Sequence, residues 1–146
     1  MASHPDDLRY TEKHLWVRPG DKLVEVGITQ FAADELGAIG FVELPYPGEL
    51  FKAGALLGRI SGEKSSKALL MPFIGQVNAV NQALGDSPGL VNDDPYGKGW
   101  IVRLEVGALA DVEALLPAAS YEATLTALAR RGLMPARVER EHGRPV

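Results

Sequence analysis

One lysine stands where its amine could be used for covalent chemistry. The segment SGEKSSKALLMPFIG, residues 61–75, places Lys64 at a short turn next to a run of apolar residues. Strands on both sides would fix the ends of this turn, so the Lys64 side chain would project from a rigid support. Gly62, Ser65 and Ser66 leave little bulk around the ammonium group. A long arm attached there would be held near the domain at high effective concentration, as in carrier domains that pass intermediates between active sites.

A simpler interpretation treats the same lysine as part of the solvated surface. Lys64 and Lys67 would then be two ordinary turn lysines. Spacing alone favours this interpretation, and only features elsewhere in the chain can decide between the two.

Few other residues offer a catalytic or metal-binding centre. The chain has no cysteine, which excludes disulfides, thiolate metal ligands and a cysteine nucleophile. Its three histidines, His4, His14 and His142, are far apart and show no ligand spacing such as HxxxH. No GxSxG nucleophile elbow is present. This inventory favours a binding or carrier protein over an enzyme.

The elements that must position Lys64 are mostly short strands. Alternation of polar and apolar residues predicts strands at 10–18, 22–29, 41–45, 55–60, 68–73, 76–81 and 100–106. Pro19-Gly20-Asp21 predicts a hairpin between the first two. Thr29 and Gly37 predict the cap and the end of a short helix.

The second half of the chain changes from loop to helix. Residues 82–99 are rich in Gly, Pro, Asn and Asp and predict a long loop. Residues 108–116 predict a short helix that ends before Pro117. A second helix is predicted to start at a Ser120 cap and to end just before Gly132.

Length and composition indicate one globular domain. The chain has 146 residues, 46% of them hydrophobic and 23% charged. The predicted fold is mainly β, a two-sheet sandwich with a short helix in the N-terminal half and C-terminal helices. We expect a flexible N-terminus over 1–7, the domain over 8–132, and a disordered tail over 133–146.

The charge distribution and the apolar runs restrict the partners and the location. Residues 1–129 contain ten Lys/Arg and 17 Asp/Glu, whereas residues 130–146 contain five Arg and two Glu. An acidic body argues against nucleic acid, which needs a basic footprint. No stretch approaches the roughly 20 apolar residues of a membrane span, and MASHPDDLRYTEKH lacks a secretory pattern. We therefore expect a cytoplasmic protein with neither a nucleic-acid nor a membrane partner.

Three longer blocks carry a family resemblance. They are YTEKHLWV at 10–17, VGITQFAADELGAIGFVELP at 26–45 and VNDDPYGKGW at 91–100. In this order they resemble the H protein of the glycine cleavage system over about residues 8–128. The resemblance implies a lipoyl/biotinyl-type barrel-sandwich hybrid fold with lipoate in an amide on Lys64. It also implies that lipoylating enzymes read Gly75.

The residues beside Lys64 separate a lipoyl carrier from a biotin carrier. Biotin carriers of this fold resemble Met-Lys-Met at the hairpin, whereas Glu63 and Ser65 flank Lys64 here. The resemblance therefore favours lipoate, with Glu63 and Ser65 as parts of the attachment site. Glu63 and Lys67 are charged where the family pattern is apolar or small, so a dedicated lipoate-attachment system is a possible consequence.

Departures from the family pattern gather around the cofactor. Leu15 replaces a glutamate, Ser61 and Ala68 replace acids on either side of the lysine, and Phe31 replaces a common histidine. In the family, several of these polar groups line the groove where the loaded arm rests. Carboxylates there suit an aminomethyl cation, so their loss predicts a neutral or sulfur-rich cargo.

These departures lead to three interpretations. The sequence looks most like the lipoate-binding proteins of the heterodisulfide-reductase-like sulfur-oxidation system, because a dithiolane exchanges with thiols and accepts sulfur. The alternative is a glycine cleavage H protein that carries the aminomethyl group. The third is an unlipoylated structural or regulatory relative, suggested by Ser61 in the place of an acid.

The partners expected depend on these interpretations. A lipoate ligase or lipoyl transferase is common to the first two. The others are a heterodisulfide-reductase-like complex or the glycine cleavage enzymes, namely the decarboxylase, the aminomethyltransferase and dihydrolipoamide dehydrogenase.

Overall fold

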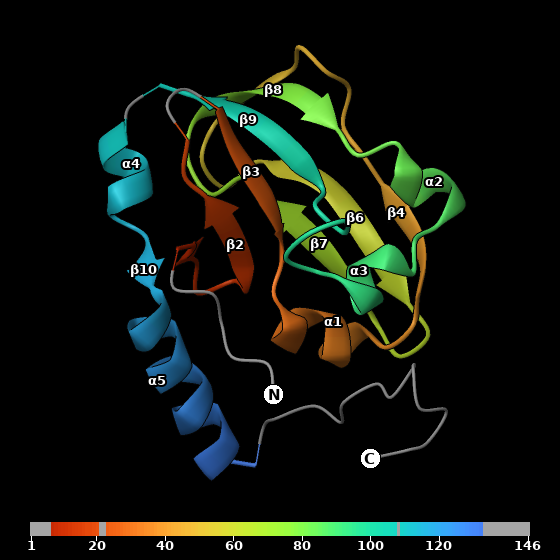
Figure 1. Ribbon diagram of the computed structural model, residues 1–146, viewed down its shortest axis with the longest axis vertical. Helices are drawn as coiled ribbons and strands as arrows, with labels where there is room; N and C mark the ends of the chain where they lie inside the picture. Colours follow the sequence, from red (N-terminus) through yellow and green to blue (C-terminus); the bar gives the residue numbers. More distant parts are fainter. Residues whose placement is uncertain (1–6, 21–22, 108, 133–146) are drawn as a thin grey trace.

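Two antiparallel sheets form the body of the protein (Figure 1). The computed structural model describes residues 7–20, 23–107 and 109–132. Within these residues, seven strands pair in the order β10-β1-β2-β3-β9-β8-β5 and three in the order β4-β6-β7. The predicted mainly β, two-sheet fold is therefore confirmed. The strands are β1 Arg9–Tyr10, β2 Leu15–Arg18, β3 Leu23–Ile28, β4 Ile39–Glu43, β5 Leu50–Phe51, β6 Leu56–Gly62, β7 Ser66–Leu70, β8 Gly75–Val80, β9 Val102–Val106 and β10 Leu116–Pro117.

The main core lies between the two sheets. Alternate residues of β3 and β9 point inward, so Val24 and Leu104 pair across the strands and are both buried. They share one apolar cluster with Ile60 and Leu69 of the three-stranded sheet. Each such buried side chain stabilises the fold by about 1.5–3 kcal/mol. The period-two pattern in the sequence thus becomes the inner face of each sheet.

A second, smaller core joins the C-terminal helix to the strand edge. Helix α5, Ala118–Arg130, presents Tyr121 and Leu125 from one face. They pack against Leu8, Tyr10 and Trp16, and the Tyr10 and Tyr121 rings stack with centroids 4.8 Å apart. The helix therefore covers the edge that β1 and β10 form (Figure 1).

The strand predicted over 10–18 is two strands, so that prediction was wrong in detail. A tight turn at residues 11–14 separates β1 from β2, which pair with each other. The Thr11 hydroxyl accepts hydrogen bonds from the Lys13 and Leu15 amides at 3.2 Å. His14 adopts a φ of 67°, the left-handed conformation that few residues with a side chain take. The alternation of residue types conceals this turn.

Several other boundaries differ from the predictions. β6 and β7 extend closer to Lys64 than the predicted strands at 55–60 and 68–73, so the hairpin turn is confined to residues 63–65. The predicted 82–99 loop contains two single-turn helices, α2 at Ala83–Asp86 and α3 at Leu90–Asp93. The last helix starts at Ala118 after Pro117, so Ser120 is not its cap. The remaining helices are α1 at Gln30–Leu36 and α4 at Leu109–Glu113.

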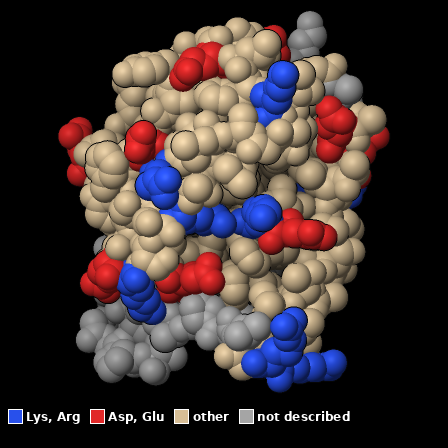
Figure 2. All heavy atoms as spheres, turned by 180° about the vertical axis from the view of Figure 1, so that it is seen from behind, with Lys and Arg blue, Asp and Glu red and all other residues tan. Residues whose placement is uncertain are grey.

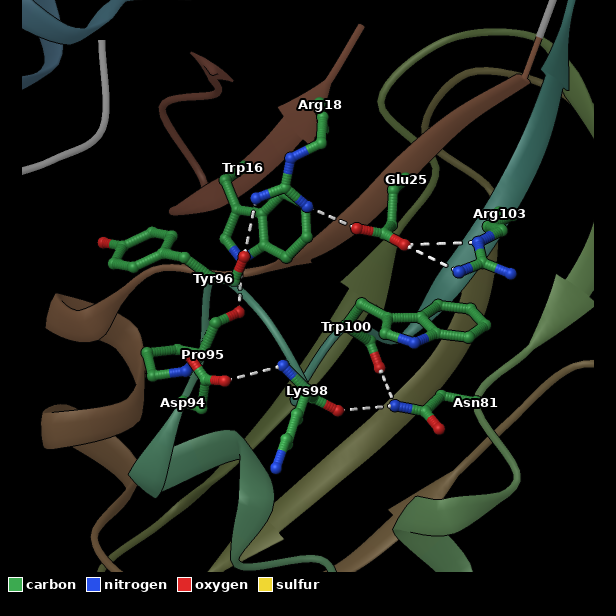
Figure 3. Close-up of polar contacts among 10 residues, drawn as sticks. All are labelled: Trp16, Arg18, Glu25, Asn81, Asp94, Pro95, Tyr96, Lys98, Trp100 and Arg103. Atoms are coloured by element: carbon green, nitrogen blue, oxygen red, sulfur yellow. Dashed lines mark hydrogen bonds and ion pairs between the residues drawn. The ribbon is translucent and has the colours of Figure 1, made fainter. Parts of the chain in front are cut away.

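Side chains of β2, together with Asn81 just after β8, hold the loop at 94–100 (Figure 3). Trp16 Nε1 donates to the Pro95 carbonyl at 2.8 Å, and the Arg18 guanidinium donates to the Tyr96 carbonyl at 2.6 Å. Asn81 Nδ2 donates to the carbonyls of Lys98 and Trp100 at 2.9 and 2.7 Å. The loop is therefore fixed at several points of its backbone.

A row of charges crosses the strands beside this loop (Figure 3). Glu25 accepts from Arg18 on one side and from Arg103 on the other, and the two arginines lie over Trp16 and Trp100. The row ties β2, β3 and β9 together on the surface.

The ends of the chain carry two untested expectations. Residues 1–6 and 133–146, where flexibility and disorder were predicted, lie outside the described residues, as does Asp21 of the predicted hairpin turn. Among the residues that the structure describes, no helix is long and apolar enough to cross a membrane.

Candidate functional site

Lys64 lies at the tip of the β6–β7 hairpin and is exposed to solvent. Ser61 pairs with Ser66, and the Gly62 amide donates to the Ser65 carbonyl at 2.9 Å. The turn is therefore short and hydrogen-bonded across its base. Glu63 and Ser65 flank Lys64 on the tip and are also exposed.

The back of this tip rests on the end of α1. The Lys64 amide donates to the Leu36 carbonyl at 2.9 Å, and the Glu63 amide donates to the Ala38 carbonyl at 3.0 Å. Gly62 permits this approach, since a Cβ there would lie 2.2 Å from the Leu36 oxygen. Gly37, with a φ of 82°, permits it from the other side, since its Cβ would lie 2.9 Å from Lys64 Cγ. The backbone of Lys64 is thus held, as a rigid attachment point requires.

The amine of Lys64 stays at the surface. Its Nζ donates a long hydrogen bond of 3.4 Å to the Asp34 carbonyl in the last turn of α1. Carbonyls at a helix C-terminus favour a nearby cation, and this long contact helps to place the unmodified ammonium. Conversion of the amine to an amide would remove the charge and release the side chain from this interaction.

One buried asparagine fixes the segment on which the tip rests. Asn92 Nδ2 donates to the Gly37 carbonyl at 2.9 Å, and its Oδ1 accepts from the Ile39 amide at 2.8 Å. Asn92 therefore clamps the α1–β4 connection from the loop side. Sequence patterns do not reveal this residue: it lies in the VNDDPYGKGW block, but its partners are more than 50 positions away.

A cavity of about 380 Å³ lies beyond the far end of β7 from the tip. Leu15, Leu70, Met71 and Leu116 contribute to mainly apolar walls, and Leu15 is only 3% exposed. The charged residues Glu12 and Lys13 also line it. Such a cavity suits an apolar chain with a small polar group at its end.

A half-buried lysine lies on the strand between the tip and the cavity. Lys67 pairs with Ile60 on the edge strand β7 and shares the inward face with Leu69. Burial lowers the pKa of Lys67, Glu35 opposes this shift, and Lys13 adds to it. Inward-pointing charges of this kind protect an edge strand from pairing with other chains.

His14 lies close enough to Lys67 to feel its charge. Burial, with a further contribution from Lys67, lowers the pKa of His14 to about 4. Its Nδ1 lies 2.8 Å from the Tyr121 hydroxyl, which also bonds the Thr29 hydroxyl. His14 is therefore neutral near pH 7 and serves structure.

The structure brings some of the predicted site residues together and separates others. Leu15 lines the cavity, whereas Ala68 is half-buried on β7 opposite Arg59. Phe31 is buried against the His14 ring with centroids 4.4 Å apart. Neither Phe31 nor Ala68 lines the cavity.

Gly75, the predicted recognition glycine, has a packing role. It lies buried at the start of β8 in the seven-stranded sheet, where a Cβ would be 2.8 Å from the Glu105 carbonyl. The close approach of the β9 backbone is by itself enough to require a glycine at this position. Recognition of Gly75 by a lipoylating enzyme stays a prediction.

Two features of the described residues carry the chemistry of this site. Across the described residues, no group of three His, Cys, Asp or Glu side chains is placed to hold a metal ion. The chemistry of the site therefore centres on an exposed amine on a rigid hairpin and on an apolar cavity along the same strand. These features define a carrier domain for a covalently attached arm.

Comparisons with known proteins give the family. The sequence model described as "Glycine cleavage H-protein" matches residues 8–128. The chain is 46% identical over 123 residues to the glycine cleavage system H protein of Listeria monocytogenes, covering 84% of this chain and 98% of that protein. It is 47% identical over 131 residues to the one from Mycobacterium avium, covering 86% and 99%. The chain belongs to the glycine cleavage H-protein family.

The fold agrees with this assignment. A crystal structure of a glycine cleavage system H protein from Mycobacterium marinum matches with a TM-score of 0.77 and 37% identity, covering 84% of this chain and 99% of that one. Members of the family are non-catalytic carrier proteins of a multienzyme system and carry lipoate on a lysine. The relatives support the glycine cleavage alternative, and they give no support to the sulfur-oxidation interpretation that the departures suggested.

Proposed function

We propose that this chain is the lipoyl carrier of a glycine cleavage system, with lipoate in an amide on Lys64. The observation that carries the proposal is the exposed Lys64 amine on a hairpin whose backbone is bonded to the end of α1. A held backbone with a solvent-exposed side chain lets an attached arm swing while its root stays in place. The family membership supports the choice of lipoate and of glycine cleavage.

The cavity beside Leu15 gives the arm a resting place. Four residue steps along β7, at about 3.3 Å each, place Leu70 and the cavity about 13 Å from the start of the strand. Apolar walls would hold the hydrocarbon part of the arm, and Thr11, Glu12 and Lys13 would face its polar end. When bound, the dithiolane of lipoate supplies the sulfur atoms that take up the cargo and exchange electrons.

The proposed partners follow from this role. A lipoate ligase or lipoyl transferase would modify Lys64. The glycine decarboxylase, the aminomethyltransferase and dihydrolipoamide dehydrogenase would then meet the arm in turn. The cytoplasmic location predicted from the sequence is part of the same proposal.

The test of the attachment site uses the two lysines of the hairpin. We expect intact mass analysis of protein from a lipoate-competent host to show one lipoyl group on the wild type. The same addition is expected on Lys67→Arg, because Lys67 is half-buried and faces inward, and none is expected on Lys64→Arg. A lipoyl group on Lys67, or none on the wild type, would overturn the assignment.

A second candidate function is a carrier for sulfur oxidation. It is favoured by one observation, the uncharged Leu15 in the cavity wall, because Leu15 supplies no counter-charge for a cationic cargo and the charges of Glu12 and Lys13 offset each other. The lipoylated protein should be offered to glycine decarboxylase with glycine. Efficient aminomethyl loading would support glycine cleavage and remove this candidate, whereas absent loading of a fully lipoylated protein would favour it.

A further inference from the structure

The outer face of the three-stranded sheet presents an exposed aromatic ring beside the attachment site. Phe41 on β4 pairs with Ser61 on β6, which pairs with Ser66 on β7. Gly62, the neighbour of Ser61, leads directly into the tip that holds Lys64. Phe41 is 58% exposed, which is high for an aromatic residue on a strand.

The neighbours of this ring on the sheet surface are small side chains and two residues of opposite charge. The next row across the sheet is Glu43, Arg59 and Ala68, in pairing register. Two serines and an alanine leave Phe41 standing above small side chains. Figure 2 views the molecule from behind, and Lys and Arg groups there adjoin Asp and Glu groups across the middle of the face, with mostly uncharged atoms above them. We call Phe41, Glu43, Arg59, Ser61 and Ser66 the Phe41 face.

The hairpin tip can be approached from this face because its other side is occupied. Helix α1 packs on the inner side of the sheet, where Ala33 and Leu36 join the core with Ile60. The amides of Glu63 and Lys64 are bonded to the end of that helix and the residue after it. The Lys64 amine rests near the Asp34 carbonyl of α1, so an enzyme that draws it out of this long contact can approach the tip across the Phe41 face, which adjoins it.

The state of Lys64 decides which partner needs this face. Before modification, the amine extends only a lysine side chain from the tip, so the attaching enzyme must contact the tip itself. After modification, the long arm reaches out, and the other partners can act farther from the surface. Close contact with the surface beside Lys64 is thus required most strictly by the attaching enzyme.

We propose that the Phe41 face is the docking surface for the enzyme that attaches lipoate to Lys64; this rests on the proposed function. That enzyme would offer an apolar pocket for the Phe41 ring and charges complementary to Glu43 and Arg59. Exposed aromatic anchors in a polar surround are typical of residues that dominate binding. In the reaction, the deprotonated amine attacks the activated lipoyl carboxyl carbon. The C–N bond forms, the bond to the leaving group breaks, and the amine loses a proton.

The experiment compares Phe41→Ser with Tyr46→Ser. Tyr46 is a matched control, since it is also aromatic and is 78% exposed, but it lies in the turn after β4. Each unmodified protein is given lipoate, ATP and a lipoate ligase that modifies the wild type, and modification is followed by intact mass. We expect kcat/KM to fall at least about tenfold for Phe41→Ser and to stay at the wild-type value for Tyr46→Ser.

A second variant and a second reaction keep the test decisive. The double change Glu43→Lys with Arg59→Glu keeps opposite charges at two neighbouring positions of β4 and β6 but exchanges their signs. Each charge would then face a like charge on the enzyme, so this variant should also be modified more slowly. Phe41→Ser that has been fully lipoylated by long incubation should be reduced by NADH and dihydrolipoamide dehydrogenase at the wild-type rate, with NADH oxidised to NAD⁺ as the dithiolane becomes the dithiol. Unchanged kcat/KM in both variants, or an equal loss in the dehydrogenase reaction, would overturn the proposal. Failure of the wild type to accept lipoate would instead overturn the proposed function.

Discussion

At the scale of single residues, His14 shows how burial sets a pH dependence. The pKa of His14 falls from its ordinary value near 6.5 to about 4 because the ring is buried and lies near Lys67. The folded state therefore binds this proton less readily than the unfolded state does. Stability is fully present above about pH 6.5 and is lost as the pH falls toward 4. The shift corresponds to about 3 kcal/mol, which solvent at this half-buried ring reduces to about 1–2 kcal/mol.

The expected result is a smaller acid sensitivity in His14→Asn. Asparagine tolerates the left-handed backbone of this position but has no titration between pH 7.5 and 5. Urea unfolding at these two pH values should show a free energy of unfolding that falls by about 1–2 kcal/mol more in the wild type than in the variant. Equal falls in both proteins would show that other groups cause the acid sensitivity.

At the scale of elements, the α1–β4 connection links a distant loop to the attachment hairpin. Asn92→Ala would remove both hydrogen bonds to this connection and leave a buried amide and carbonyl without that partner. Asn81→Ala is the matched control, because Asn81 is equally buried and holds two carbonyls of the same loop. Both changes should cost about 2–4 kcal/mol of stability.

Only Asn92→Ala should loosen the hairpin tip. Hydrogen exchange at the amides of Glu63 and Lys64, which are bonded to Ala38 and Leu36, is expected to become at least about tenfold faster in this variant than in Asn81→Ala. Equal exchange in the two variants would contradict the coupling between loop and hairpin.

The same elements show what could be predicted from the sequence. The hairpin around Lys64 and the helix between Thr29 and Gly37 follow from local patterns, namely alternation, a cap and a glycine stop. The turn at 11–14 was not predictable in this way, because the Thr11 hydroxyl and a left-handed His14 create it within an unbroken alternation. The Asn92 clamp was missed because its contacts depend on tertiary structure. The contact of Phe31 with the His14 ring joins residues 17 positions apart and follows from no local pattern, and the place of Phe31 beside a bound arm stays a prediction.

At the scale of the whole molecule, two cores divide the stability between them. The sandwich core holds the strands and the attachment hairpin, while the second core holds α5 against β1 through Tyr10 and Tyr121. The apolar residues of the second core are few, and α5 contacts mainly β1 and β10. Local unfolding of this helix should therefore cost less than global unfolding.

Leu125→Ala and Leu69→Ala separate these two units. Each removes a buried leucine, one from the second core and one from the sandwich core, and each should cost about 2–4 kcal/mol. In native-state hydrogen exchange, Leu125→Ala should speed exchange of the α5 amides and leave those of β8 and β9 unchanged. Leu69→Ala should speed exchange of the slowest amides in β8 and β9, because it lowers the free energy of global unfolding. If Leu125→Ala speeds exchange equally in the helix and in these strands, the two cores unfold as one unit, and α5 is then an integral part of the structure that holds Lys64 in place.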